Sequence, residues 1–429
     1  MVCGKRGRRQ FCAHVEHHHL GRGLPVESTH RGERRTQGGG GLRTGRNTAT
    51  ALAVRTRRRR FRIVPAAVAA VPGFLAAAFP VAAVLLGVLA SRPASAEQYT
   101  LRVGSGHPAG ATVYVTVLRD YLVPELRRRV AEETDHELRI IEGYGGSIAS
   151  VAETLEAVQI GILDIGAYCT CFEPAKLFLH NFQYFVPFGP QDAQLAMRVA
   201  RQVYDAYPWL SDHLEDNYRQ TVLAINGWDN YHLGSSVPWE SVEDLRGVKV
   251  AGAGPNLPWL EFAGVIPVQS TLPDGYMSLQ TGVYSGWVMF PSAYAAYKFH
   301  EPAPYYTMIG FGAMGGAVIV AMNTRSLSRL PAEVQQIVAE VGRSYEVEAA
   351  RVLDERQMAG LEMLQASGAE IRELPAGVRV QWAQSLMDFP DRMAKDADSR
   401  GMPGSEVIAA YIEAVTQSGY DWPVRYVIE

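Results

Sequence analysis

The chain has 429 residues, of which 47% are hydrophobic and 20% are charged, a composition typical of a globular protein with two or three domains. Residues 1–96 hold 17 of the 41 Lys and Arg but only three of the 44 Asp and Glu, so residues 97–429 have a formal charge of −17. Because a nucleic-acid-binding face must be basic to neutralise phosphates, the acidic body excludes nucleic acid as an expected partner.

The N-terminal part has the pattern of an export signal. A basic run at 57–60 precedes an apolar stretch at 63–90, and Ala94-Ser95-Ala96 follows it. These three features predict a signal peptide over 54–96, cleaved near Ala96, and hence a periplasmic protein without stable membrane insertion. The alternative is a retained membrane anchor, but three prolines interrupt the apolar stretch. Residues 1–53 show no hydrophobic period and are expected to be disordered or an over-long translation start.

The mature chain alternates short apolar runs with amphipathic segments, which predicts an α/β fold. Strands are expected at 99–103, 138–141, 162–165, 221–225, 248–250, 287–290 and 317–322. Apolar spacing predicts helices at 112–133, kinked or split by Pro124, and at 151–159. In such units the ligand-facing loops lie at the carboxyl ends of the strands.

Two cysteines, Cys169 and Cys171, remain after the predicted cleavage. A metal site would need further ligands at suitable spacing, and none is near. Burial in the core as free thiols and a disulfide between the two both remain open. The sequence predicts neither a metal nor a cofactor.

A long helix is expected at 332–365, with Pro331 before its first turn and Gly368 beyond its end. Gly342 and Gly360 weaken it by about 1 kcal/mol each relative to Ala. At about 1.5 Å per residue the helix spans roughly 50 Å, which is more than one lobe is wide.

Four stretches resemble, in order, the solute-binding subunits of tripartite ATP-independent periplasmic (TRAP) transporters, a family similar to the C4-dicarboxylate-binding proteins. They are 155–166 (LEAVQIGILDIG), 244–250 (DLRGVKV), 267–286 with YMSLQTG inside it, and 298–301. The resemblance covers essentially all of residues 98–425.

This resemblance implies an α/β, two-lobed periplasmic binding protein fold with hinge strands and a long lobe-spanning helix. Residues 97–227 plus about 313–356 are then expected to form lobe I, and about 228–312 plus 357–429 to form lobe II. It also implies a monomer that is not an enzyme and whose partners are a small-molecule ligand and the membrane permease subunits.

The sequence departs from the family at its usual polar contacts. Many members hold a substrate carboxylate with an arginine four positions after the glycine of Asp-Leu-x-Gly, where this chain has Ala251. A second arginine of some members corresponds to Tyr231. A frequent asparagine corresponds to Met289, and the aspartate of the x-Asp-Gly motif to Ser285. The acidic residue with which some relatives bind a metal–carboxylate complex corresponds to Val288, so no metal is expected.

Aromatic residues with one acidic neighbour are expected to line the cleft instead. The segment 228–232 lies where the resemblance places the hinge, and alternation along 287–289 predicts that Trp287 and Met289 face inward. The loop 252–256 is either an anion cradle or a simple turn. The candidate ligand-binding residues are His107, Tyr168, Trp228, Asp229, Tyr231, Asn256, Trp287 and Met289.

These residues suggest a periplasmic solute-binding protein that captures a small organic acid, aromatic rather than clamped by arginine, for a TRAP-type secondary transporter. A cation held over Trp228 and Trp287 with Asp229 nearby is the second ligand class. A sensor module for a membrane receptor and a periplasmic enzyme on the same fold are the alternative functions. No catalytic motif supports the enzyme.

Overall fold

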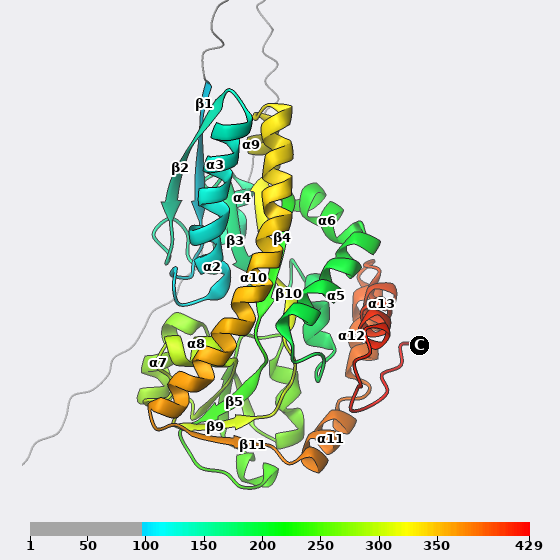
Figure 1. The fold of residues 1–429 in the computed structure, drawn as a ribbon. Helices are drawn as coiled ribbons and strands as arrows, with labels where there is room; N and C mark the ends of the chain where they lie inside the picture. The colour runs from blue at the N-terminus through cyan, green and yellow to red at the C-terminus, as the bar shows by residue number, and fades with distance from the viewer. Residues whose placement is uncertain (1–96) are drawn as a thin grey trace, which may run out of the picture. The chain divides into compact units, whose positions relative to one another are not determined.

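The computed structural model of the protein describes residues 97–429 and contains two β-sheets (Figure 1). The predicted signal peptide and the segment before it lie outside the described residues. Helices and strands alternate along most of the chain, which confirms the α/β prediction.

The first sheet has five strands in the order β2-β1-β3-β10-β4. They are β1 (Glu97–Gly104), β2 (His136–Gly143), β3 (Ile165–Cys169), β4 (Gln220–Trp228) and β10 (Met314–Asn323). β1 pairs in parallel with β2 and β3, whereas β10 is antiparallel to β3 and β4. All ten residues of β10 are buried, so this strand forms the centre of the core.

One strand begins later than the sequence predicts. The expected strand at 162–165 is a bend, and β3 starts only at Ile165. The Asp164 carboxylate there accepts hydrogen bonds from the backbone and the guanidinium of Arg102 on β1. The Asp164 N–H also donates to the Arg102 carbonyl (2.8 Å), so side-chain and backbone bonds both tie the start of β3 to β1.

The helix predicted at 112–133 is divided as Pro124 suggests. It consists of α2 (Val113–Val117), a π-helical turn (Leu118–Leu122) and α3 (Val123–Glu133). Pro124 lies in the first turn of α3. Because proline has no N–H to donate, the hydrogen-bond ladder changes register just before it.

The second sheet has six strands in the order β11-β9-β5-β8-β6-β7. They are β5 (His232–Ser235), β6 (Lys249–Gly252), β7 (Ile266–Gln269), β8 (Gly286–Met289), β9 (Tyr305–Met308) and β11 (Glu370–Glu373). β8 pairs in parallel with β6 and antiparallel with β5, so the carboxyl ends of β6 and β8 lie at the same edge of the sheet.

The remaining helices surround the two sheets. They are α4 (Thr154–Gln159), α5 (Ala193–Ala206), α6 (Trp209–Tyr218), α7 (Leu272–Gln280), α8 (Pro291–Ala296), α9 (Thr324–Ser328), α10 (Ala332–Ala366), α11 (Ala376–Ser385), α12 (Phe389–Ser399) and α13 (Gly404–Gln417). α13 packs on α5, although the predicted division assigns these helices to different lobes. Within residues 97–429, no helix combines the length and the apolar character that a membrane crossing needs.

Helix α10 confirms the predicted long helix and contacts elements beside both sheets. Figure 1 shows it running past α3 and β4 at one end and α8 at the other. A Cβ on Gly342 would lie 2.3 Å from the carbonyl oxygen of Leu223 on β4, and one on Gly360 would lie 2.7 Å from the backbone of Pro291 on α8. The two glycines that weaken the helix therefore allow its closest approaches to its neighbours.

Two chain segments cross between the sheets beside α10, one after β4 and one before β10, and they bond to each other. The Tyr231 N–H donates to the Gly312 carbonyl (3.1 Å), and the Gly312 N–H donates to the side chain of Asn230 (3.0 Å). The Asn230 N–H also donates to Gln357 on α10 (2.9 Å). These bonds support the expected hinge of crossing strands near Trp228.

Candidate functional site

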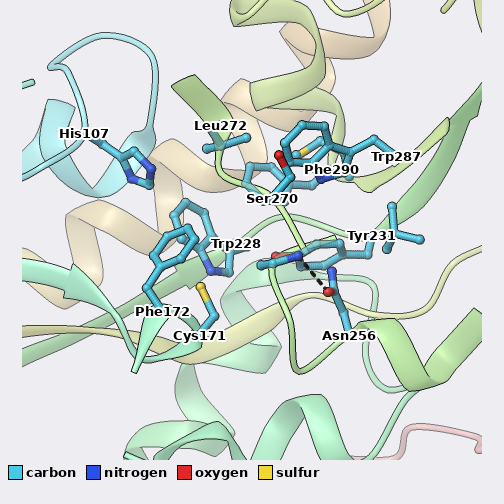
Figure 2. A pocket seen from close by; sticks show the side chains of 13 residues that line it. His107, Cys171, Phe172, Trp228, Tyr231, Asn256, Ser270, Leu272, Trp287 and Phe290 are labelled. Carbon is cyan, nitrogen blue, oxygen red and sulfur yellow. Dashed lines mark hydrogen bonds between the residues drawn. The ribbon is translucent and has the colours of Figure 1, made fainter. Parts of the chain in front are cut away.

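A cavity lies where the carboxyl ends of strands from both sheets meet (Figure 2). The loop after β1 and the end of β4 border it from the first sheet, and the segments after β6 and β8 border it from the second. The space open to the centre of a water molecule is about 20 Å³, which is room for about one water. Side chains therefore nearly fill the cavity in this structure.

Six of the eight sequence-predicted residues line the cavity together. They are His107, Trp228, Tyr231, Asn256, Trp287 and Met289. The cavity also borders Val288, so the expected alternation along β8 does not divide this strand cleanly into inward and outward residues.

Tyr168 and Asp229 do not line the cavity. Tyr168 lies on β3, and its hydroxyl donates to the side chain of Gln220 (2.7 Å) within a separate apolar cluster. Asp229 points toward α8, where it accepts hydrogen bonds from the N–H (3.0 Å) and the hydroxyl (2.6 Å) of Ser292. Because the segment 228–231 crosses between sheets, its successive side chains do not share one face.

Burial raises the pKa of Asp229 from its ordinary value of 3.8 to about 7, while the two hydrogen bonds from Ser292 act in the opposite direction. The side chain is fully buried. Its carboxyl group is therefore anchored to α8 and is not available to pair with a cation in the cavity.

Aromatic rings form much of the cavity wall. Trp228 stacks on Phe290 with ring centroids 4.9 Å apart and planes 20° apart. Tyr231 meets the same Phe290 edge-on at 5.1 Å, and its hydroxyl bonds to that of Tyr184 (3.1 Å). Such offset and edge-to-face contacts are the favoured geometries of aromatic pairs, and they join the end of β4 to the end of β8.

His107 occupies the loop after β1 and is fully buried. Its Nδ1 lies 2.8 Å from the Tyr114 hydroxyl, which in turn lies 3.1 Å from the Ser105 hydroxyl. Burial lowers the pKa of His107 to about 4. The imidazole is therefore neutral at physiological pH.

Phe290, expected as part of an aromatic cleft, and Ala253, in the loop 252–256, also line the cavity. Sequence reasoning missed five further cavity residues as ligand contacts: Cys171, Phe172, Ser270, Leu272 and Val288. Ser270 and Leu272 follow β7, and Cys171 and Phe172 follow β3, so their place after strand ends was the available signal. The sequence did not decide between free thiols and a disulfide at Cys169 and Cys171. In the structure the two residues form a disulfide.

The departures from the family pattern fall at this site. Ala251 is a buried residue of β6, paired with Trp287 of β8. The loop 252–256 forms a turn in which Asn256 accepts a hydrogen bond from the Ala253 N–H (3.0 Å). None of the residues that line the cavity is Lys, Arg, Asp or Glu. Among residues 97–429, no group of three or more His, Cys, Asp or Glu is arranged to hold a metal ion.

Comparison with known proteins gives one family. Residues 120–396 match the bacterial extracellular solute-binding protein family 7. An uncharacterised protein, YiiZ of Salmonella typhimurium, is 23% identical over 273 residues, which are 60% of this chain and 79% of that protein. A monocarboxylate 2-oxoacid-binding periplasmic protein of Nostoc sp. is 27% identical over 49% of this chain, but the match spans only 57% of that relative.

Solved structures share the fold. A TRAP solute-binding protein from Rhodoferax ferrireducens in complex with copurified benzoate has a TM-score of 0.67 at 16% identity, covering 75% of this chain and 98% of that one. A Bordetella pertussis extracytoplasmic solute receptor binding pyroglutamic acid has a TM-score of 0.62 at 20% identity, with 73% and 99% covered. The two-lobed fold expected from the sequence is thus confirmed.

Proposed function

The chain belongs to the bacterial extracellular solute-binding proteins of family 7, and on that premise we propose that it captures a small organic acid and delivers it to a TRAP-type secondary transporter. The observation that carries the proposal is the aromatic cavity between the two sheets, bordered by residues on both sides of the hinge segments. Ligands commonly bind at such crevices beyond the carboxyl ends of strands.

The residues that line the cavity suit an acid with an aromatic or apolar body best. Trp228, Tyr231, Trp287 and Phe290 offer apolar surface, and Ala251 provides no guanidinium. Two structural relatives support this class, since their bound ligands are benzoate and 3-hydroxybenzoate. The cationic alternative loses its supporting residue, because the Asp229 carboxyl group is held by Ser292 outside the cavity.

The bound ligand draws the two lobes together. Because the cavity holds about one water molecule in this structure, entry of an acid requires the sheets to separate. The crossing segments after β4 and before β10 supply the hinge, and α10 braces it. A sensor module would close in the same way. Binding of the closed form to a permease would show that the partner is a transporter and not a receptor.

The working protein is periplasmic and monomeric and begins near Glu97. The family resemblance and the pattern of residues 54–96 support this location. N-terminal sequencing of the exported protein should find a start at Glu97, and a start well before it would exclude cleavage at Ala96.

Small-angle scattering with an acid panel tests the proposed function. An acid that binds should lower the radius of gyration of the protein below that of the ligand-free form. A protein that shows neither binding nor a change in radius of gyration with any acid at saturating concentration would exclude the function.

A further inference from the structure

Three buried nitrogen atoms at the cavity lack hydrogen-bond partners. Within residues 97–429, ten buried side-chain N or O atoms have none, and three of them belong to cavity residues: His107 Nε2, Trp228 Nε1 and Asn256 Nδ2. All three side chains are at least nine-tenths buried. Since a buried polar group without a partner is costly, their gathering at one cavity indicates a ligand with hydrogen-bond acceptors.

Each of these three nitrogen atoms can donate a hydrogen bond. The Asn256 Oδ1 accepts from the Ala253 N–H, which orients the amide NH₂ group away from that bond. The Trp228 indole nitrogen can only donate. It lies near the Tyr184 hydroxyl, whose pKa is raised by burial, a rise that Tyr231 and Trp228 partly oppose, yet the indole nitrogen has no hydrogen-bond partner in this structure.

The tautomer of His107 depends on a chain of hydrogen bonds. The Ser105 oxygen accepts from the backbone N–H of His107 (3.4 Å) and lies 3.1 Å from the Tyr114 hydroxyl, where either oxygen can donate. When Ser105 donates to Tyr114, the Tyr114 hydroxyl donates to His107 Nδ1 (2.8 Å). A neutral imidazole that accepts at Nδ1 carries its proton on Nε2, which is the atom without a partner.

The donors belong to both sides of the cavity. His107 follows β1 and Trp228 ends β4, whereas Asn256 follows β6 of the second sheet. Figure 2 shows His107 and Trp228 on one side of the cavity and Asn256 on another. Hydrogen-bond donors from the loops of both sheets therefore border the same cavity.

We propose that these three neutral N–H groups bind the carboxylate of the ligand in place of an arginine, and that the ligand is a monocarboxylate with a compact aromatic or apolar body. The inference rests on the proposed function and names its substrate class. Phe172 and Leu272 offer no hydrogen bond to a second carboxylate, and no Lys or Arg lines the cavity to neutralise its charge. Because an unpaired buried carboxylate is strongly disfavoured, dicarboxylates are rejected.

Calorimetric titration of the mature protein tests this with four probes: benzoate, 2-oxobutyrate, terephthalate and galacturonate. Terephthalate adds a second carboxylate to the benzoate ring, and galacturonate adds several hydroxyl groups. At least one monocarboxylate should bind, and it should bind about 100-fold or more tightly than either of the other two. Preference for terephthalate or galacturonate overturns the proposed class and leaves the solute-binding function intact, whereas binding of no acid at all refutes the function itself.

Asn256→Asp tests the donors directly. The substituted side chain keeps an oxygen for the Ala253 N–H but replaces the amide donor with a negative charge. Loss of one hydrogen bond to a charged group weakens binding about 10- to 100-fold, and the added charge increases the loss. Trp228→Phe, which keeps one aromatic ring and removes the N–H together with the rest of the indole, should weaken binding about 10-fold or more.

Gln183→Glu is the matched control. Gln183 is buried, its Oε1 accepts from the Gly316 N–H (2.9 Å), and its Nε2 has no partner, but it does not line the cavity. This variant undergoes the same exchange of amide for carboxylate and should keep wild-type affinity. Equal affinity in wild type, Asn256→Asp and Trp228→Phe overturns the inference, as does an equal loss in Gln183→Glu and Asn256→Asp.

Discussion

Replacement of Gly360 by Ala tests whether α10 braces the second lobe through close contact with α8. The added Cβ would lie 2.7 Å from the carbonyl carbon and oxygen of Pro291 and 2.9 Å from the Ser292 nitrogen. These are backbone atoms that cannot rotate aside, so α10 and α8 must move apart. Such overpacking costs about 1–3 kcal/mol, against a gain of about 1 kcal/mol from better helix propensity.

Gly377→Ala provides the reference, because a Cβ at this position in α11 meets no atom within 4 Å. Urea unfolding followed by tryptophan fluorescence should place Gly360→Ala about 1–3 kcal/mol below Gly377→Ala in free energy of unfolding. Affinity for a bound acid should fall as well, since Ser292 on α8 holds Asp229 beside Trp228. A Gly360→Ala protein as stable as Gly377→Ala would refute the close packing of α10 on α8.

Two further substitutions concern buried charges. Asp229 keeps a proton in the folded protein up to a pH of about 7, but the unfolded chain loses it near 3.8, so stability should decrease as the pH rises between these values, by at most about 1.4 kcal/mol per pH unit. Asp229→Asn, which resembles the protonated form, should flatten this slope in unfolding titrations, and an unchanged slope would contradict the assignment. Glu346→Ala leaves the largely buried Arg201 without its main partner and should cost about 3–5 kcal/mol in free energy of unfolding. Glu355→Ala removes one partner of an exposed ion pair and should lower the free energy of unfolding by less than about 1 kcal/mol. Equal losses in the two variants would show that the buried pair of Glu346 and Arg201 contributes no more than an exposed one.

The sequence predicted the elements that have a strong local period. The long helix and the central strands were placed within a few residues, because apolar spacing over 35 residues in α10 and the continuous apolar run of β10 are unambiguous. The role of Gly342 and Gly360 could not be predicted, since it depends on backbone atoms of β4 and α8 that are distant in sequence.

The candidate site was predicted in part for a similar reason. Positions after strand ends identified His107 and Asn256 as candidates, the family resemblance identified Trp228, and all three line the cavity. Asp229 was misplaced because the direction of a side chain in a crossing segment is set by tertiary contacts, here with Ser292. The three nitrogen atoms without partners could not be predicted, because whether a buried group is hydrogen-bonded depends on the packing of the folded core.

Native mass spectrometry of the mature protein, purified gently from cells, identifies the ligand that the protein carries. The wild-type protein should retain a small monocarboxylic acid that is released on unfolding, and Asn256→Asp should retain much less of it. A retained dicarboxylate or cation, or the same acid in equal amount on both proteins, would contradict this expectation.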